Sequence, residues 1–208
     1  MHKNCIVRFL FIKIFQKSMD KQTFACYTLK KNKCEHGGIM RILGIDPGYA
    51  IMGWGVLDVE GNHFKVIAYD SLLTDKDTPM PERLKSLYDG LTDIINMYKP
   101  DEASIEELYF NNNAKTAIMV GEARGIAVLA CANGGLPIGE YTPLQIKQAL
   151  VGFGRAEKKQ VQQMVKSILN LESVPKPDDT ADALAAAICH GHSTGGRAQR
   201  ELRIRKGI

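Results

Sequence analysis

The sequence has no apolar run of about eighteen residues, the length that a helix needs to cross a membrane. It also has no internal repeat and no low-complexity linker at which the central part could be divided into two domains. Hydrophobic residues make up 45% and charged residues 24% of the 208 residues, which excludes a wholly disordered, collagen-like or coiled-coil protein. We therefore expect one globular domain of ordinary size, with additional segments at its ends.

The five cysteines lack the CxxC spacing of a metal knuckle. Three of them fall in residues 1–39, whereas Cys131 and Cys189 lie in apolar, helix-like surroundings. Buried, reduced thiols of this kind are typical of a cytoplasmic protein, so we expect that location and no disulfide framework.

The central part of the chain has no excess of positive charge, although the whole chain has a formal net charge of +4. Residues 1–39 carry eight basic and two acidic residues, and residues 195–208 carry five basic residues and one acidic residue. Residues 40–194 are left with 14 basic and 20 acidic residues, a net charge of −6. Net charge is therefore no argument for nucleic-acid binding, which needs basic residues placed beside the ligand.

Both ends of the chain differ from its middle. Residues 1–39 show no clean periodicity, and Arg8 and Lys13 interrupt the apolar segment that a secretory signal would need. Because the pattern becomes protein-like at Met40, we expect 1–39 to be a non-native or disordered extension. Residues 193–208 are basic and have no apolar stripe, so we expect a disordered tail after a domain that spans 40–192.

Apolar periodicity predicts the elements of that domain. Three consecutive strands joined by tight turns are expected at Arg41–Asp46, Ile51–Val59 and His63–Leu73, and two more at Glu102–Glu106 and Pro137–Tyr141. Helices are expected at Pro81–Tyr98, at Ala114–Asn133, from the N-cap Thr142 to about Leu150, from Lys158 to Leu171, and at Asp178–His192. This order predicts an α/β fold with a five-stranded mixed sheet, its first three strands antiparallel, flanked by helices.

Four acidic residues stand at informative places in this pattern. Asp46 ends the first strand and Glu106 ends the fourth, so both carboxylates reach one crevice if these strands are neighbours. Asp179 and Asp182 are three residues apart at the start of the last helix and share one face. Each residue alone has an ordinary explanation, as a turn former or as a charge that favours the helix dipole. Together they form a candidate site.

Carboxylates that converge in this way need a cation if all of them are to stay ionised. Oxygen ligands without histidine or cysteine favour Mg²⁺, with Mn²⁺ as a substitute, over zinc. Two such ions about 4 Å apart support in-line attack on a phosphodiester. The candidate metal ligands are Asp46, Glu106, Asp179 and Asp182.

Five motifs in order resemble the RuvC family of Holliday-junction resolvases. They are ILGIDPG (42–48), SIEELYF (104–110), GEARG (121–125), VGFGRAEKKQVQQMV (151–165) and DDTADALAAAICHGH (178–192). The resemblance covers Met40 to His192. It implies a ribonuclease-H-like fold, a homodimer, and Mg²⁺-dependent paired nicking of four-way DNA junctions in recombination and repair. It also implies 5′-phosphate and 3′-hydroxyl ends, and the RuvAB branch-migration complex as a partner.

The resemblance also implies roles for single residues. The four acids of the family fall on the candidate metal ligands, although Asp178 makes the third position ambiguous; the spacing to the DALA run (182–185) favours Asp179. The stacking aromatic of the family falls on Tyr109, where the family commonly has phenylalanine, with Phe110 beside it. Basic residues near the scissile phosphates fall on Lys147 and on Lys158, which we also place among the catalytic residues, and Arg155 and Lys159 extend that patch.

Three other functions are compatible with parts of the pattern. A related ribonuclease-H-like nuclease that processes ribosomal RNA would keep the fold and the metals. An actin-like or Hsp70-like ATPase shares the G-I-D-P-G hairpin, but such proteins need two duplicated domains. A non-catalytic junction-binding module would not need all four acids. His190 and His192, two residues apart at a helix end, do not face one ligand, so we expect them to be structural or exposed to solvent.

Overall fold

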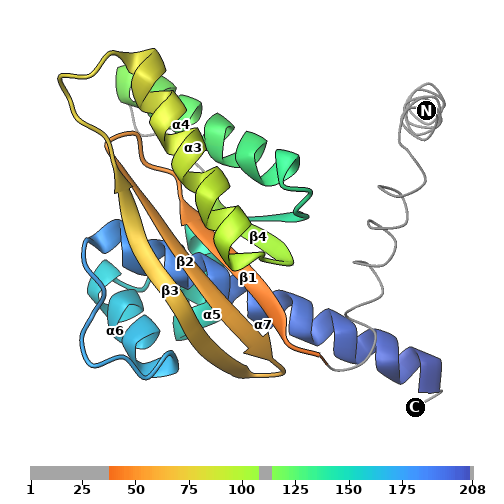
Figure 1. Cartoon of the computed structure of the whole chain (residues 1–208). Coiled ribbons are helices and arrows are strands. Elements are labelled where there is room, and N and C mark those ends of the chain that lie inside the picture. The colour runs from red at the N-terminus through yellow and green to blue at the C-terminus, as the bar shows by residue number, and fades with distance from the viewer. Residues whose placement is uncertain (1–37, 108–113, 207–208) are drawn as a thin grey trace, which may run out of the picture. The chain divides into compact units, whose positions relative to one another are not determined.

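Five strands form one mixed sheet in the order β3-β2-β1-β4-β5 (Figure 1). The computed structural model describes residues 38–107 and 114–206, with side chains in 38–107 and 117–194. The strands are β1 (Met40–Asp46), β2 (Ile51–Glu60), β3 (His63–Leu73), β4 (Glu102–Glu106) and β5 (Ile138–Tyr141). The first three strands pair antiparallel, whereas β4 is parallel to β1 and to β5. The predicted α/β fold with a five-stranded mixed sheet is confirmed.

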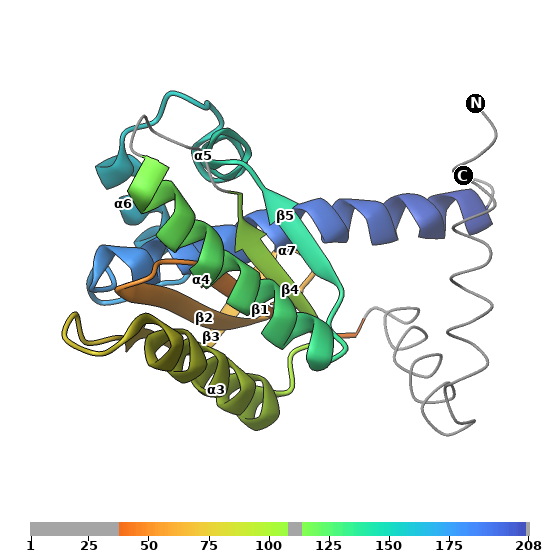
Figure 2. The same cartoon turned by 90° about the horizontal axis from the view of Figure 1, so that it is seen from above.

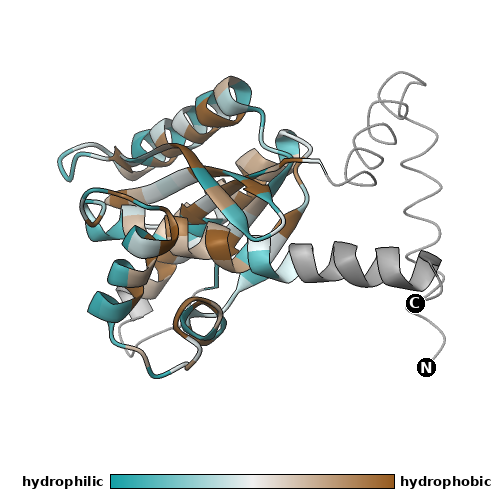
Figure 3. Ribbon diagram, turned by 90° about the horizontal axis from the view of Figure 1, so that it is seen from below, coloured by the Kyte–Doolittle hydropathy of each residue, from teal (hydrophilic) through white to brown (hydrophobic). Residues whose placement is uncertain are grey.

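Helices cover both faces of the sheet, as Figure 2 shows from above. On one face lie α3 (Met80–Tyr98) and α4 (Ala114–Asn133), and on the other lie α5 (Pro143–Val151), α6 (Lys158–Ile168) and α7 (Asp178–Lys206). Each layer has its own apolar core against the sheet, one that includes Leu43, Leu91 and Ala127 and one that includes Ile42, Val165 and Leu184. In Figure 3 the brown residues gather on the strands and on the inner sides of the helices.

Local signals explain where the helices begin and end. The Thr142 hydroxyl accepts the backbone N–H of Gln145, and the Gln145 side chain in turn accepts the Thr142 N–H, so a capping box starts α5. Gly152 ends α5 with a φ of 88°, a value that favours glycine. Asn170 adopts a φ of 50°, so α6 ends at Ile168 and not at Leu171 as predicted.

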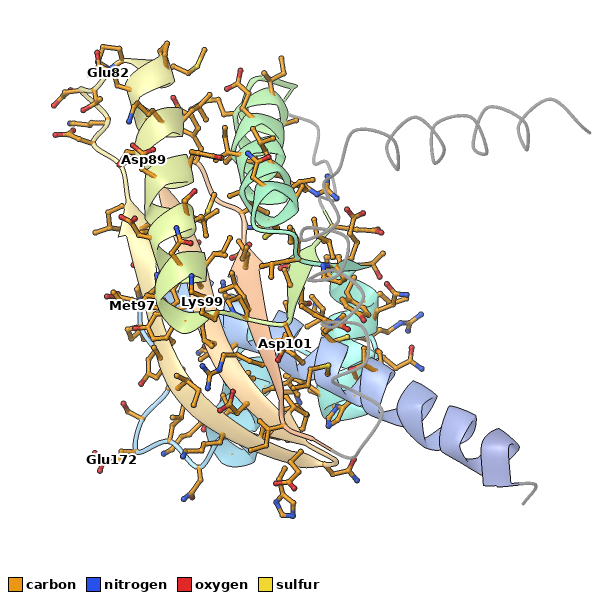
Figure 4. The ribbon with its side chains drawn as sticks, turned by 45° about the vertical axis from the view of Figure 1, so that its right-hand side comes forward. Glu82, Asp89, Met97, Lys99, Asp101 and Glu172 are labelled. Carbon is orange, nitrogen blue, oxygen red and sulfur yellow. The ribbon has the colours of Figure 1, made fainter. Side chains whose placement is uncertain are left out.

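The start of β1 is held by charged side chains at the first residues of the domain. The Arg41 guanidinium donates to both carboxylate oxygens of Asp58, at 2.7 Å and 2.9 Å. The Arg41 backbone N–H donates to the Asp101 carboxylate at 2.9 Å, and Asp101 is labelled in Figure 4. These contacts tie β1 to β2 and to the segment that enters β4.

The helix α7 packs unusually close to the sheet because glycines face it. A Cβ atom built on Gly44 of β1 would lie 2.1 Å from the carbonyl oxygen of Ala183. The alanines of α7 that face the sheet, such as Ala183 and Ala187, are fully buried. Small residues on both surfaces therefore let the helix backbone approach the strands, and this fixes where the first turn of α7 lies.

The last helix is longer than predicted. Its predicted end at His192 is wrong, since α7 continues to Lys206. The Ser193 and Thr194 hydroxyls donate back to the carbonyl oxygens of Cys189 and His190 at 2.9 Å, so these polar residues fit within the helix. The residues that follow include alanine, glutamine, leucine and arginine, which favour helix and outweigh the glycine pair that indicated a break. In the described parts of the chain, no helix is long and apolar enough to cross a membrane.

Candidate active site

Asp46 and Glu106 lie at the ends of neighbouring parallel strands. Ile45 of β1 is in register with Ile105 of β4, so the acid that follows each of them lies at the same edge of the sheet. Both side chains are half-buried. β1 and β4 are neighbours in the sheet, which is the condition under which the sequence predicts that the two carboxylates reach one crevice.

The first turn of α7 brings the other two acids to the same edge. Gly53 of β2 is the residue paired with Asp46, and a Cβ atom on Gly53 would lie 2.0 Å from the carbonyl oxygen of Asp179. The backbone of Asp179 therefore rests directly on the strand beside Asp46. Asp182, one helical turn further on, has a side chain that is 23% exposed.

The acids at this edge are close enough for their charges to affect one another. Burial raises the pKa of Asp46 well above its ordinary value, and the charges of the other three acids raise it further. Burial and the charge of Asp182 raise the pKa of Glu106 to about 7. Burial also raises the pKa of Asp182. The site thus concentrates negative charge in a poorly hydrated place, which is unfavourable unless a cation compensates it.

Lys158 is the cation that the protein itself supplies. It is the first residue of α6, and its Nζ lies 2.9 Å from Oδ2 of Asp182 and 3.7 Å from Oδ2 of Asp178. Burial by itself lowers the pKa of the ammonium group, but the hydrogen bond to Asp182 and the neighbouring carboxylates outweigh burial and raise it. Lys158 therefore stays charged beside the acids, and one ammonium group cannot neutralise four carboxylates.

Asp178 and Asp179 differ in their surroundings. The Lys176 ammonium donates to Oδ1 of Asp178 at 3.0 Å and lowers the pKa of that carboxyl. Asp179, and not Asp178, is among the charges that raise the pKa of Asp46. Lys176 was not anticipated from the sequence, although its place two residues before Asp178 could have indicated it.

The other predicted site residues fall into three groups. Lys147 on α5 is half-buried and its charge lowers the pKa of Glu106, so it faces the site. Arg155 and Lys159 flank the start of α6 and are exposed. Tyr109 and Phe110 lie outside the described residues, so their predicted stacking role is not addressed by the structure.

The donor set fits a hard divalent cation. All four groups are carboxylates. Burial, and after it the charges of neighbouring acids, raise the pKa values of Asp46, Glu106 and Asp182, and a divalent ion would compensate both effects. In the side-chain positions found here, no group of three or more His, Cys, Asp or Glu residues within the described ranges already surrounds a point suited to an ion. The Lys158 ammonium occupies part of that role through its contact with Asp182.

Two histidines of the last motif have structural contacts. His190 is buried, and its Nε2 lies 2.6 Å from the Glu102 carboxylate. The ring of His192 packs edge-on against Phe64, with 5.0 Å between ring centroids. The two side chains face different neighbours, in agreement with the prediction that they do not form a metal pair. Arg124, in the GEARG motif on α4, forms an ion pair with Glu140 of β5, with 2.9 Å between Nη2 and Oε1.

Comparison with known proteins agrees with this architecture. The family model for crossover junction endodeoxyribonuclease RuvC matches residues 42–190. The protein of that name from Alkaliphilus oremlandii is 60% identical over 154 residues, which are 74% of this chain and 94% of that protein. The one from Desulforamulus reducens is 58% identical over 161 residues, 76% of this chain and 99% of that protein.

A solved structure shows the same fold. Thermus thermophilus RuvC in complex with a Holliday junction substrate superposes with a TM-score of 0.69 at 32% identity, over 74% of this chain and 95% of that one. The fold is therefore ribonuclease-H-like, as the motifs implied. Sequence motifs, strand order and relatives agree, and the chain belongs to the RuvC family of crossover junction endodeoxyribonucleases.

Proposed function

We propose that the protein resolves Holliday junctions by paired symmetric nicks in recombination and DNA repair, leaving 5′-phosphate and 3′-hydroxyl ends. The observation that carries this proposal is the meeting of four carboxylates from β1, β4 and α7 at one edge of the sheet, in a chain of the RuvC family. A metal-dependent nuclease of this family needs such a set of acids, and a module that only binds junctions does not.

Two Mg²⁺ ions per site, replaceable by Mn²⁺, are the cofactors that the acids support best. Asp46, Glu106, Asp179 and Asp182 would hold them, since carboxylate oxygens are the ligands these ions prefer. Bound divalent cations supply Lewis-acid chemistry, namely activation of the attacking water and stabilisation of charge on the leaving 3′ oxygen.

The basic residues would position the DNA. Lys158 and Lys147 reach the acids from α6 and α5, where they can neutralise a scissile phosphate and hold it against the acids. Arg155 and Lys159 are exposed beside them and extend the positive surface toward the flanking backbone. Tyr109, with Phe110, is the candidate for stacking on a base at the junction centre.

The outward face of α4 supports a homodimer. Ile118 and Leu129 are 63% and 48% exposed, and their spacing of eleven residues, about three helical turns, places them on the same face. Gly125 lies between them, and a Cβ atom there would meet nothing within 4 Å. An exposed stripe of large and very small residues lets a second copy of the helix approach closely, and two copies of the site are what paired nicking requires.

The remaining expectations follow from the family. We propose that residues 40–192 form the nuclease domain, that the RuvAB branch-migration complex is its partner, and that the protein acts in the cytoplasm. The anchoring of Arg41 to Asp58 and Asp101 supports a domain that begins at residue 40.

One experiment separates the candidate functions. The full chain is incubated with labelled four-way DNA, linear duplex DNA and precursor ribosomal RNA, each with Mg²⁺ and with EDTA. We expect symmetric nicks in the four-way DNA alone, only with Mg²⁺, and loss of cleavage but not of junction binding in Asp46→Asn. Preferential cleavage of the RNA would favour the ribosomal-RNA nuclease. Full cleavage by Asp46→Asn in Mg²⁺ would remove the argument for the metal site.

A further inference from the structure

A line of polar contacts joins β4 to α7 and ends at the candidate metal ligands. Glu102, Ser104 and Glu106 alternate along β4 and therefore point to one face of the sheet. Along α7, which runs in the opposite sense, their counterparts are His190, Ala186 and Asp182. We call these six residues the polar seam.

At the far end of the polar seam lies the buried side chain of His190, which contacts residues of both β4 and β5. His190 is 4% exposed, with its Nε2 at 2.6 Å from Oε2 of Glu102 and its Nδ1 at 2.9 Å from the Tyr141 hydroxyl. Both ring nitrogens are thus hydrogen-bonded, one to β4 and one to β5. A Cβ atom on Gly139 would lie 2.4 Å from Nδ1, so the glycine makes room for the ring.

The middle of the polar seam is a hydrogen bond to the helix backbone. The Ser104 hydroxyl, fully buried, donates to the carbonyl oxygen of Ala186 at 2.8 Å. An α-helical carbonyl already accepts a bond within the helix, so this second bond gives no secondary structure. What it does is tie one point of α7 to one point of β4.

The residue spacing along the strand and the helix lets the polar seam fix the position of α7 along β4. Two residues along a strand span about 6.7 Å, and four residues along a helix span about 6 Å. The contacts at Glu102 and Ser104 therefore set the next step, at which Glu106 stands opposite Asp182. A slip of one helical turn would break the contact between Glu102 and the His190 side chain and move Asp182 by about 5.4 Å away from Glu106.

Glu106 and Asp182, at the near end of the polar seam, stay close only if the position of α7 along β4 is fixed. Glu106 and Asp182 are like charges in a half-buried place, and their repulsion tends to separate β4 from the first turn of α7. Hydrogen bonds further along the same pair of elements oppose that separation while the ion is absent.

We propose that His190 is a positioning residue for the metal site, acting through Glu102 and the β4–α7 register to hold Glu106 and Asp182 at the spacing that an ion needs. This inference rests on the proposed metal-dependent function. His190 itself does not contact the reacting atoms, because it lies two helical turns beyond Asp182.

The test measures the affinity of the full-length protein for Mn²⁺ in the absence of DNA, by calorimetry and by electron paramagnetic resonance. His190→Ala should weaken Mn²⁺ binding on the order of tenfold to a hundredfold, as loss of a group behind a metal ligand does. Glu102→Ala and Ser104→Ala should weaken Mn²⁺ binding less than His190→Ala does. These two variants replace His190→Ala in the test if that variant does not fold. Glu102→Gln retains an oxygen that accepts from Nε2 and should bind close to wild type. Junction binding in EDTA should be unchanged in all four variants.

Ile188→Ala is the matched control for stability. Ile188 is fully buried on the same helix but belongs to the apolar core with α5 and α6. It should lower the melting temperature at least as much as His190→Ala and leave Mn²⁺ affinity intact. Equal loss of affinity in Ile188→Ala, or wild-type affinity in His190→Ala, would overturn the positioning role. Absence of Mn²⁺ binding in the wild type would instead overturn the metal site, and this inference with it.

Discussion

Two adjacent aspartates, Asp178 and Asp179, have different surroundings, and these bear on which of them is the third metal ligand. Asp178 is paired with Lys176 and Lys158, and its pKa is lowered, as for an ordinary surface ion pair. Asp179 rests on Gly53 beside Asp46 and adds to the charge there. The local contacts thus favour Asp179 as the third ligand, the assignment that motif spacing also favoured.

Substitution of each aspartate tests this assignment. We expect Asp179→Asn to reduce junction cleavage about 100-fold or more, equivalent to about 2.7 kcal/mol of transition-state stabilisation. Asp178→Asn should change the rate less than about threefold, because its shorter ion pair is with Lys176, at 3.0 Å, and Lys158 keeps its closer partner Asp182, at 2.9 Å. Single-turnover cleavage rates at saturating Mg²⁺ measure both. Similar losses in the two variants would mean that the position is shared.

Glu106 couples the stability of the metal-free protein to pH. Its pKa rises from 4.5 to about 7 on folding, so the folded protein binds more protons than the unfolded chain between these values. The contribution of Glu106 to the free energy of unfolding should therefore fall as pH rises through this window, by about 3–4 kcal/mol at most, and stay low above it. The raised pKa values of Asp46 and Asp182 add a slope of the same sign.

Urea denaturation in EDTA between about pH 5 and about pH 8 measures this slope. Glu106→Gln should flatten it, and Mg²⁺ should restore the stability of the wild type at the upper end. Glu60→Gln, at an exposed position, serves as the control and should keep the wild-type slope. Parallel profiles for Glu106→Gln and wild type would contradict the expected linkage.

At the scale of elements, the close contact between α7 and the sheet places two of the four acids. Gly44 on β1 and Gly53 on β2 each lie against the helix backbone, and the alanines of α7 face them. The contact has little room to adjust, because the atoms that a side chain would meet belong to the backbone.

Gly53→Ala tests this packing. The added methyl group would lie 2.0 Å from the Asp179 carbonyl oxygen, so the first turn of α7 must move. We expect a loss of about 1–3 kcal/mol in the free energy of unfolding and a larger fractional loss of cleavage than of junction binding. Gly90→Ala on α3 is the control, since its methyl group meets only the flexible end of Leu72 at 2.9 Å. An active, stable Gly53→Ala protein would show that the helix tolerates a shift.

At the scale of the whole molecule, paired nicking needs two active sites, and the outer face of α4 is the proposed interface. Leu129→Glu places a charge in this face and should shift the protein to monomers in analytical ultracentrifugation. The monomer should lose the coordination of the two nicks, so nicked junctions accumulate. Met97→Glu on α3 is the control, because Met97 is 72% exposed and lies on a different helix, as Figure 4 shows. A dimer that survives Leu129→Glu would place the interface elsewhere.

Most of the helices and strands, and the acids proposed as metal ligands, can be predicted from local sequence patterns. Strand and helix periodicity is local, and so are the capping box at Thr142 and the strand ends at Asp46 and Glu106, so these could be predicted within a few residues. The motifs also named the family. The end of α7 was missed because the pair of glycines at 195–196 indicated a break that the surrounding helix formers outweigh.

Which of these residues lie side by side depends on long-range packing. The pairing of β1 with β4, the contact of Gly53 with Asp179, and the hydrogen bond between Glu102 and His190 join segments that are far apart in the chain. Local patterns carry no information on such distances, because they depend on how closely a helix and a sheet pack. The separation of Asp178 from Asp179 depends in the same way on lysines and a glycine that packing brings beside them.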